Sequence, residues 1–321
     1  MGMIALAVDL GGTNIRVAAI DEGGTIRKRF TRPTVVAEGK EAVLARLFLA
    51  LEEVSRSFAE EQVQGVGLGC AGVIQIERGI ISQSPNFPGW ENVPIKERIQ
   101  ACLSRSVPVL VDNDANAAAM GEVWQGSAMN SKHVVCLTLG TGIGGGLVVD
   151  GNLVHGADGM AGELGHIIVD PQGPQCNCGN HGCLEAFASG TAIKREAIKI
   201  VRDYPAGELN KRCNGNPEAI TAEMVCQSAV SGDLVCRRIY ETMGRYLGIG
   251  IASLINVFNP EIVVIGGRVS RAWDLFISHT KEEIAQRAFK LPAQRAKVVP
   301  AARGDDAGLL GAAFLVFRAI R

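Results

Sequence analysis

Two glycine-rich turns constrain the fold of this chain more than any other feature. The first is Asp9–Asn14 (DLGGTN) and the second is Gly140–Gly146 (GTGIGGG). Each follows one apolar run and precedes another, and an acidic-glycine turn then leads to a third run, as in a meander of strands. The copies lie about 130 residues apart, which favours two related domains over a solenoid, although glycine-joined hairpins are also common by themselves. The predicted strands are Ile4–Val8, Ile15–Ile20 and Thr25–Phe30 in the first copy, and Val134–Leu139, Leu147–Val149 and Asn152–Val154 in the second.

The remaining chain alternates predicted helices with predicted strands. Apolar residues recur at helical spacing or form short continuous runs that are typical of strands buried on both faces. This alternation predicts an α/β fold with a mostly parallel sheet in each half, and ligands of such sheets lie at the carboxyl ends of the strands. The predicted helices are Glu41–Phe58, Ala115–Trp124, Met243–Phe258 and Leu309–Ile320, and the predicted strands are Val63–Leu68, Val107–Val111 and Ile262–Ile265.

Composition excludes several classes of protein. The net charge is −1, so there is no electrostatic reason to expect nucleic acid or an anionic membrane as a partner. No apolar run approaches the roughly 20 residues that span a bilayer. The apolar start lacks a basic region and contains Asp9, so we expect a first strand there and a cytoplasmic protein. The nine cysteines are then better explained as thiols or metal ligands than as disulfides.

The first turn offers backbone N–H groups directly after Asp9. Such a nest binds phosphate, the acid can hold Mg²⁺ through water, and Thr13 adds a hydroxyl. No Gly-Lys-Ser/Thr follows and Gly-x-Gly-x-x-Gly is missing, so the turn is neither a P-loop nor a dinucleotide fingerprint. Alone it fits a plain hairpin equally well. The second turn has more glycine than a hairpin requires, and together the two predict a polyphosphate site.

Acidic and amide side chains follow the strand predicted to end at Val111. A hydroxyl that attacks a phosphoryl group needs a base or an orienting acceptor nearby. Asp114 suits that role, and Asn113 could fix neighbouring hydroxyls. The alternative is that Asp114 is only the N-cap of the following helix and that Asp112 is a solvated turn residue.

Three cysteines stand within eight residues, spaced C-x-C-x₄-C: Cys176, Cys178 and Cys183. The pattern predicts a compact structural zinc site that one histidine completes, and His166 and His181 are both candidates. The alternative is three free thiols in a turn. If a metal fixes this loop, Glu163, His166 and Glu185 can converge beside Asn113 as a cup for a polyol; otherwise the two glutamates are ordinary solvated acids.

These residues together resemble the ROK family of bacterial sugar kinases and related repressors, in the actin-like ATPase superfamily. The resemblance runs nearly from end to end, and the cysteine segment matches every fixed position of the family's CxCGxxGCxE signature. It is carried by DLGGTN, SPNFPGW (Ser84–Trp90), DNDANAAAMGE (Asp112–Glu122), GTGIGGG, ELGH, CNCGNHGCLEAFASG (Cys176–Gly190) and VVIGGRVS (Val263–Ser270).

The resemblance implies a fold and a set of residue roles. It implies two ribonuclease-H-like α/β domains with an interdomain cleft: a smaller one, 1–119 plus 305–321, and a larger one, 120–304, that carries the zinc loop. Asp114 would be the catalytic base. The sugar would contact Asn86, Asn113, Glu163, His166 and Glu185. Zinc would be held by His166, Cys176, Cys178 and Cys183, which favours His166 over His181. ATP, with Mg²⁺, would contact Asp9, Gly11, Gly12, Thr13, Gly140, Thr141, Gly142, Gly144, Gly266 and Gly267.

Two positions depart from the family pattern. Arg268 stands where a third glycine often follows Gly266-Gly267, which puts the packing of adenosine in question. Ala71 stands where a proline is frequent, so the loop on the sugar side can differ. Neither change removes a group with a proposed chemical role.

The implied activity is ATP-dependent phosphorylation of a hexose, with glucose as the leading candidate. Kinases for N-acetylglucosamine, N-acetylmannosamine or fructose share most of these motifs, and polyphosphate or ADP as donor stays open. The rival class is a sugar-responsive regulator. The family's repressors carry an added N-terminal helix-turn-helix, for which Asp9 leaves no room here, so we expect an enzyme. The family's habit also implies a homo-oligomer, a dimer or a tetramer.

Overall fold

The chain is described by a computed structural model that covers residues 2–59, 62–204 and 207–320. It forms two compact units. Unit 1 consists of Met1–Lys132, Gly146–Gly162 and Ala302–Arg321, and unit 2 consists of His133–Gly145 and Glu163–Ala301. The domain boundaries predicted from the sequence, 1–119 plus 305–321 and 120–304, remain a proposal.

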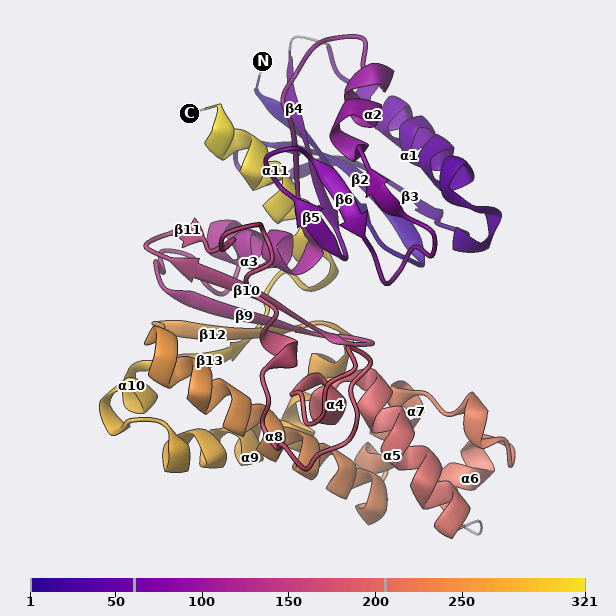
Figure 1. Cartoon of the computed structure of the whole chain (residues 1–321), viewed down its shortest axis with the longest axis vertical. Coiled ribbons are helices and arrows are strands. Elements are labelled where there is room, and N and C mark those ends of the chain that lie inside the picture. The colour runs from indigo at the N-terminus through magenta and orange to yellow at the C-terminus, as the bar shows by residue number, and fades with distance from the viewer. Residues whose placement is uncertain (1, 60–61, 205–206, 321) are drawn as a thin grey trace. The chain divides into compact units, whose positions relative to one another are not determined.

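The first sheet has the strand order β3-β2-β1-β4-β8 (Figure 1). Its strands β1, β2 and β3 form the antiparallel meander that the first glycine turn predicts, whereas β4 and β8 join β1 in parallel. The sheet is therefore mixed, and the expectation of a mostly parallel sheet is wrong, because the meander supplies as many pairings as the crossovers do. The bounds are β1 Ile4–Leu10, β2 Asn14–Asp21, β3 Ile26–Pro33, β4 Val63–Cys70 and β8 Val109–Asn113.

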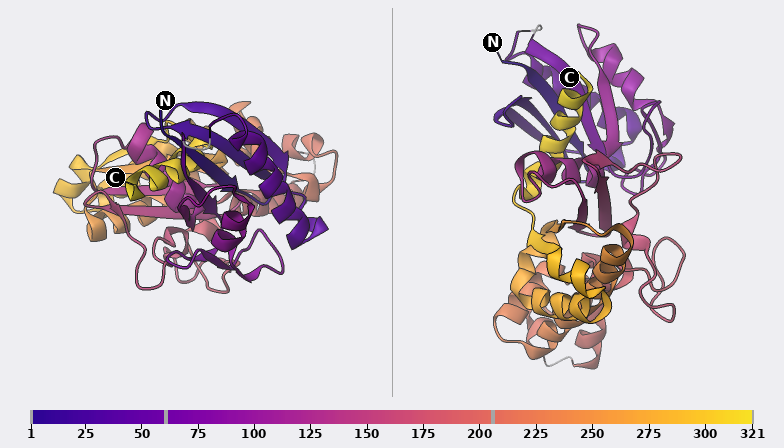
Figure 2. Two further views of the ribbon diagram at one scale, coloured as in Figure 1. Left: turned by 90° about the horizontal axis from the view of Figure 1, so that it is seen from above. Right: turned by 90° about the vertical axis from the view of Figure 1, so that its left-hand side faces the viewer.

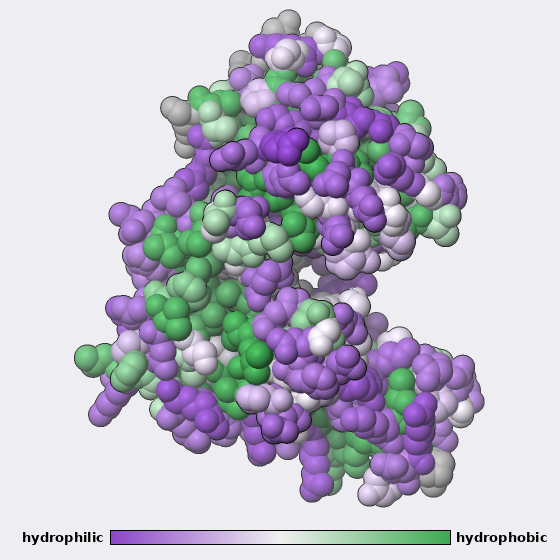
Figure 3. Space-filling model, viewed as in Figure 1, coloured by the Kyte–Doolittle hydropathy of each residue, from purple (hydrophilic) through white to green (hydrophobic). Residues whose placement is uncertain are grey.

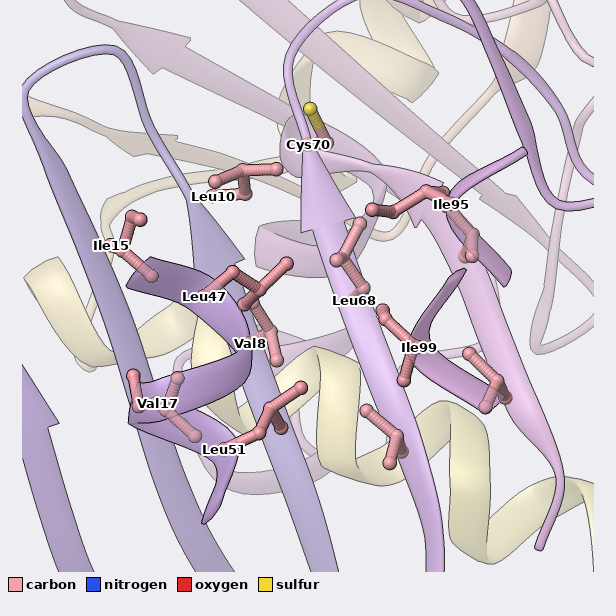
Figure 4. Packing of buried hydrophobic residues seen from close by; sticks show 14 of the residues in the cluster. Val8, Leu10, Ile15, Val17, Leu47, Leu51, Leu68, Cys70, Ile95 and Ile99 are labelled. Atoms are coloured by element: carbon pink, nitrogen blue, oxygen red, sulfur yellow. The ribbon is translucent and has the colours of Figure 1, made fainter. Parts of the chain in front are cut away.

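One face of this sheet is covered by α1 (Lys40–Ser55) and α2 (Ile95–Cys102). Apolar residues of both helices share one buried cluster with the sheet, as Figure 4 shows for Leu47, Leu51, Ile95 and Ile99. Burial of such side chains contributes about 25 cal/mol per Å² of apolar surface removed from water. The regular apolar spacing of the sequence is thus explained by this face.

The opposite face is covered by α11 (Ala307–Ala319), which packs against α3 (Asp114–Gln125), β1 and β4. Figures 1 and 2 both show α11, in yellow, beside the strands of the N-terminal segment. The approach is close at Gly311, where an added Cβ would lie 1.6 Å from the carbonyl oxygen of Ala117. It is equally close at Gly67, where a Cβ would lie 1.9 Å from Ala312 O. Glycine at these two positions lets the backbone of α11 touch the backbones of α3 and β4.

The second sheet has the order β11-β10-β9-β12-β13, in which β12 pairs in parallel with both β9 and β13 and β11 is antiparallel to β10. Numbered by their order along the chain, the strands of both sheets run 3-2-1-4-5. This shared order supports the predicted duplication. The bounds are β9 Val134–Leu139, β10 Ile143–Val149, β11 Asn152–Leu153, β12 Ile262–Gly266 and β13 Lys297–Pro300.

Most elements differ from the predicted ranges at one or both ends. The second turn is only Gly140–Gly142, because β10 begins at Ile143 and takes in the remaining glycines. Helix α8 (Leu234–Phe258) begins nine residues before the predicted Met243. Helix α1 ends at Ser55 instead of Phe58, and β8 begins at Val109 instead of Val107.

A third, small sheet was not predicted, because its strands have only three or four residues: β5 Val73–Gln75, β6 Ile80–Gln83 and β7 Glu91–Val93. The other helices belong to unit 2: α4 Glu185–Ala188, α5 Gly190–Asp203, α6 Glu208–Arg212, α7 Ala222–Val230, α9 Trp273–Arg287 and α10 Lys290–Arg295. Short 3-10 turns are Val36–Glu38, Leu164–His166, Pro217–Ala219, Arg268–Ala272 and Gly304–Asp306. No helix among the described residues is both long enough and apolar enough to span a membrane.

Three exposed apolar side chains lie where α8 ends and α10 begins. Val257, Phe289 and Leu291 are 72%, 71% and 79% exposed. Figure 3 shows green surface over α10, at the left of the lower part of the view. Exposed apolar residues in small groups are normal on protein surfaces, so this group by itself assigns no partner.

Candidate functional site

In unit 1, the sequence-predicted residues Asp9, Asn113 and Asp114 lie at one edge of the first sheet. Asp9 of β1 is in register with Gly69 of β4, and Gly69 is in register with Asp112 of β8. The next row contains Leu10, Cys70 and Asn113. The carboxyl ends of three adjacent parallel strands thus carry the acids, which is where such sheets bind ligands.

Asn113, not Asp114, is the N-cap of α3. Its side-chain Oδ1 accepts hydrogen bonds from the backbone N–H of Ala115 at 2.8 Å and of Asn116 at 3.4 Å. The interpretation of Asp114 as the cap is therefore wrong, because Asp114 already belongs to the first helical turn. Its Oδ1 accepts from Ala115 N at 2.9 Å. The Asn113 Nδ2 group donates to Gly72 O at 3.3 Å, so both ends of the Asn113 amide are fixed.

Asp112 is buried, with 2% of its surface exposed, so it is not the solvated turn residue of the alternative interpretation. Its Oδ1 accepts from Asn113 N and from Asn116 Nδ2, both at 2.8 Å. Its Oδ2 lies 2.8 Å from His155 Nε2. The hydrogen bond to this carboxylate raises the pKa of His155 above its ordinary value. Sequence reasoning assigned His155 no role, since nothing near it in the chain marks it.

Asp9 is paired with Arg16 of β2, which also donates from Nη1 to the carbonyl oxygen of Asp305 at 2.6 Å. Burial raises the pKa of Asp9, and the Arg16 guanidinium opposes that rise. Asp9 and Arg16 are cross-strand partners in the register of β1 and β2, so a pattern of facing strand residues could have found this pair.

The first glycine turn is held in place by Thr34 and lies against Asn86. Thr34 Oγ1 donates to Gly11 O at 2.6 Å, and Thr34 N donates to Thr13 O at 2.9 Å. A Cβ on Gly12 would lie 3.2 Å from the Cβ of Asn86. The structure therefore brings Asn86, far away in the sequence, to the turn that was predicted to bind phosphate.

In unit 2, the second glycine turn contacts Glu185. Glu185 Oε2 accepts from Ile143 N at 2.8 Å, and a Cβ on Gly142 would lie 2.3 Å from the same oxygen. Gly140 O accepts from Gly190 N at 2.8 Å. A Cβ on Gly267, whose φ is +83°, would lie 2.3 Å from Leu139 O, directly before the turn. The loop of Gly266 and Gly267 and the second turn are thus neighbours, while Thr141 and Gly144 lie within and just after that turn.

His166, Cys176, Cys178 and Cys183 converge in unit 2. One potential ligand atom from each lies within 4.8 Å of the others. His181 lies outside this group and contacts Gly173 O at 3.4 Å, so the geometry favours His166 as the fourth member. Burial raises the pKa of Cys183 to about 12, whereas the backbone N–H of Asn180 lowers that of Cys178.

Two sequence-predicted carboxylates border this Cys₃His group. His166 Nε2 lies 3.9 Å from Glu163 Oε2, and Cys176 Sγ lies 3.7 Å from Glu185 Oε1. His166 Nδ1 faces Cys176 Sγ at 3.7 Å. The imidazole therefore turns one nitrogen toward the thiols and the other toward a carboxylate. Glu185 in turn connects the cysteine loop to the second glycine turn.

Comparison with known proteins identifies the family. A sequence model of the ROK family matches residues 5–319. The chain belongs to the ROK family. The resemblance seen in the sequence motifs is thereby confirmed.

ROK relatives include both enzymes and regulators. The chain is 41% identical over 311 residues to a glucokinase of Thermotoga maritima, covering 97% of this chain and 96% of the relative. It is 33% identical to the ROK family glucokinase of Streptomyces griseus crystallised with glucose and AMPPNP, with a TM-score of 0.82 and 98% and 99% coverage. It is also 33% identical to a xylose repressor of Caldicellulosiruptor bescii, covering 97% of this chain and 77% of that relative. Membership in the ROK family therefore establishes the fold, whereas its members include both kinases and repressors.

Proposed function

We propose that this ROK protein is a glucokinase, which transfers the γ-phosphoryl group of ATP to glucose and forms glucose 6-phosphate. The observation that carries the proposal is the 41% identity to the Thermotoga maritima glucokinase over nearly the whole of both chains. The site is consistent with that reaction, because unit 1 carries acids at the carboxyl ends of its strands and unit 2 carries a bare glycine turn that contacts Glu185.

Asp114 is the proposed catalytic base. Phosphoryl transfer asks little covalent chemistry of a protein: it needs a positioned hydroxyl, an acceptor for its proton and stabilisation of the developing charge. Asp114 stands in the first turn of α3, one residue after the fixed amide of Asn113. In our proposal Asn113 holds a neighbouring sugar hydroxyl, and Asp114 accepts the proton of the primary hydroxyl as it attacks.

The two glycine turns are the proposed contacts of the ATP phosphates, with Gly266 and Gly267 near the adenosine. Backbone N–H groups without side chains can approach phosphate oxygens closely. The partly buried Asp9 carboxylate fits a hydrated Mg²⁺, whose preferred ligands are oxygens. Bound Mg²⁺ would neutralise charge on the transferring phosphate, and Arg16 holds the Asp9 carboxylate in position.

The Cys₃His group is the proposed zinc site. Three thiol sulfurs and one imidazole nitrogen within 4.8 Å of one another match the donor set and the compactness of a structural zinc site. Zinc would fix the loop that leads to Glu185. Glu163, His166 and Glu185 would then hold the sugar hydroxyls, together with Asn86 and Asn113.

The interdomain cleft and the homo-oligomer predicted from the sequence remain parts of this proposal. The same holds for the preference for glucose over N-acetylglucosamine, N-acetylmannosamine or fructose, since kinases for these sugars share most of the sequence motifs.

A coupled assay for ADP release tests the proposal. The purified protein is supplied with ATP and Mg²⁺ and with each of the four sugars in turn. Polyphosphate or ADP then replaces ATP, and formation of sugar phosphate is measured instead, because neither of these donors releases ADP. We expect turnover with glucose and ATP and the highest kcat/KM for that pair. Release of ADP with none of the sugars, at normal folding and zinc content, contradicts the proposal.

The second candidate is a sugar-binding regulator, favoured by the 33% identity to the xylose repressor. Calorimetry distinguishes the two activities. A regulator binds a sugar without any phosphorylated product, whereas a kinase yields sugar phosphate in the same sample once ATP is added.

A further inference from the structure

The carboxylate of Asp112 is one of the few charged groups buried in unit 1, and it lies directly before the Asn113–Asp114 pair. Both of its oxygens are engaged. Oδ1 accepts from Asn113 N, at the end of β8, and from Asn116 Nδ2, in the first turn of α3. Oδ2 faces a single partner, His155 Nε2, at 2.8 Å.

His155 reaches Asp112 from a different segment of unit 1, the residues that follow β11. That segment is itself held in shape: Ala161 N donates to His155 O at 3.0 Å. A Cβ on Gly159 would lie 2.6 Å from Ile74 O, so the segment packs closely against β5. The imidazole is therefore presented from a braced loop, with its side chain 32% exposed, whereas that of Asp112 is 3% exposed.

Asn116 adds a further observation. Its Oδ1 is buried and has no hydrogen-bond partner among the described residues, so the contact with Asp112 fixes its amide. The first turn of α3 thus depends on Asp112 at two points, one backbone N–H and one side-chain amide. Asp112 in turn depends on His155 for the satisfaction of its second oxygen.

We propose that His155 is a positioning residue: by donating to Asp112, it holds the first turn of α3 in the one conformation that presents Asp114. This inference rests on the proposed role of Asp114. A buried carboxylate oxygen that accepts no hydrogen bond destabilises the folded state. Without His155, the Asp112 side chain is therefore expected to rotate toward another donor. When Asp112 rotates, it releases Asn113 N and Asn116 Nδ2, and the turn loses its fixed geometry.

The effect is expected on kcat more than on KM. The Asn113 side chain also donates to Gly72 O, a bond that does not involve α3 or Asp112, so its contact with the sugar is expected to survive. Asp114 has to be placed to within a fraction of an ångström of the reacting hydroxyl. A misplacement of about 1 Å in a catalytic group can cost about 100-fold in rate.

The experiment compares His155→Ala with His155→Gln, whose amide is neutral but keeps a donor at the end of a side chain of similar reach. We expect His155→Ala to lower kcat by about 10- to 100-fold, while KM for glucose and for ATP stays within about threefold. His155→Gln is expected to restore kcat to within about threefold of the wild type. His279→Ala is the matched control, because His279 also stands beside a carboxylate, Glu282, but on α9 of unit 2.

Near-UV circular dichroism and zinc content establish that each variant is folded. Should His155→Ala unfold, His155→Asn replaces it, since its amide is one methylene shorter than that of glutamine and does not reach Asp112. A wild-type kcat in a folded variant without the donor overturns the inference. So does an equal loss of kcat in the alanine and glutamine variants. Neither result touches the proposed function, which fails if the wild type phosphorylates no sugar. The role of Asp114, on which this inference rests, fails separately if Asp114→Asn retains kcat.

Discussion

The first glycine turn, in unit 1, and the second, in unit 2, occupy the same position in two sheets of the same strand order. A threonine hydroxyl from another segment fastens each of them: Thr34 Oγ1 donates to Gly11 O, and Thr191 Oγ1 donates to Thr141 O at 2.7 Å. The residue two places before the first glycine differs, being Asp9 in one copy and Thr138 in the other. The scaffold is repeated, and the chemistry is not.

The same contrast holds at the neighbouring strand ends. In the first sheet the fifth strand runs into Asp112, Asn113 and Asp114, whereas in the second sheet β13 ends in Val299 and Pro300. The acids of the proposed reaction therefore belong to one copy, and the other contributes glycines and the cysteine loop. A duplicated sheet with the same edge geometry can divide labour in this way, since only loop residues have to change.

The largest expected effect on kcat comes from a substitution at the acidic strand end of the first sheet, in unit 1. We expect Asp114→Asn to lower kcat by roughly 10²- to 10⁴-fold, the range that general base catalysis contributes, while glucose binding by calorimetry is retained. Asp274→Asn, an exposed acid on α9, is the control and should leave kcat unchanged. A normal kcat for Asp114→Asn would refute the assignment of the base to unit 1.

Removal of a cysteine tests the other copy. Cys178→Ser takes one ligand from the Cys₃His group, so bound zinc should fall from about one per chain to near zero, as elemental analysis measures. The loosened loop should raise KM for glucose by roughly tenfold, because Glu185 follows the loop directly. Cys102→Ser, in α2 of unit 1, is the control. Wild-type protein purified without any zinc contradicts the metal assignment.

Two glycine substitutions compare the turns directly. In Gly142→Ala the new Cβ would lie 2.3 Å from Glu185 Oε2, so the carboxylate has to move and loses its bond to Ile143 N. We expect KM for glucose to rise roughly tenfold, the value of one lost hydrogen bond to a charged group. In Gly12→Ala the nearest atom, Asn86 Cβ, is 3.2 Å away, so Asn86 has to move by only a few tenths of an ångström. We therefore expect the KM for glucose to change by less than about threefold. A larger rise in the KM for glucose in Gly12→Ala than in Gly142→Ala contradicts the inference that a side chain at position 142 displaces Glu185.

The smallest expected effect concerns pH. The hydrogen bond to Asp112 raises the pKa of His155 above the ordinary value of 6.5. The stabilisation that protonated His155 gains from Asp112 is therefore fully present at pH values below 6.5, and it is lost as the pH rises through the raised pKa of His155. The melting temperature of the wild type should exceed that of His155→Gln by about 1–3 °C more at pH 5.5 than at pH 8.5. An identical difference at both pH values contradicts this reasoning.

Much of the fold could be predicted from local sequence pattern. The strand β9 was predicted residue for residue, and most other elements were found with their ends displaced by a few residues. The turn before β10 was predicted too long, because glycine marks a possible turn but does not oblige one: the residues at Gly144 to Gly146 adopt the strand conformation as soon as the sheet offers hydrogen bonds.

The candidate site was predicted less evenly. The cysteine spacing predicted a compact cluster but did not distinguish His166 from His181, since both are close to the cysteines in sequence. The family resemblance favoured His166, and the folded chain places His166 in the cluster and His181 outside it. Asp112 was interpreted as a possible solvated acid because its partner, His155, is 43 residues away along the chain. Contacts between segments that are distant in sequence produce no repeating pattern in the sequence. Such contacts surround both Asp112 and Asn86, so their environments could not be predicted.

The C-terminal helix α11 has a consequence for how the chain comes off the ribosome. It covers one face of the first sheet through Leu309, Ala312 and Val316, and Arg303 N donates to the buried Glu122 of α3 just before it. During synthesis the N-terminal strands of the first sheet therefore remain uncovered on that face until the C-terminal helix α11 has emerged from the ribosome. During that interval the nascent sheet exposes apolar surface, so a ribosome-associated chaperone has a defined place to act and a premature stop before residue 307 leaves an aggregation-prone fragment.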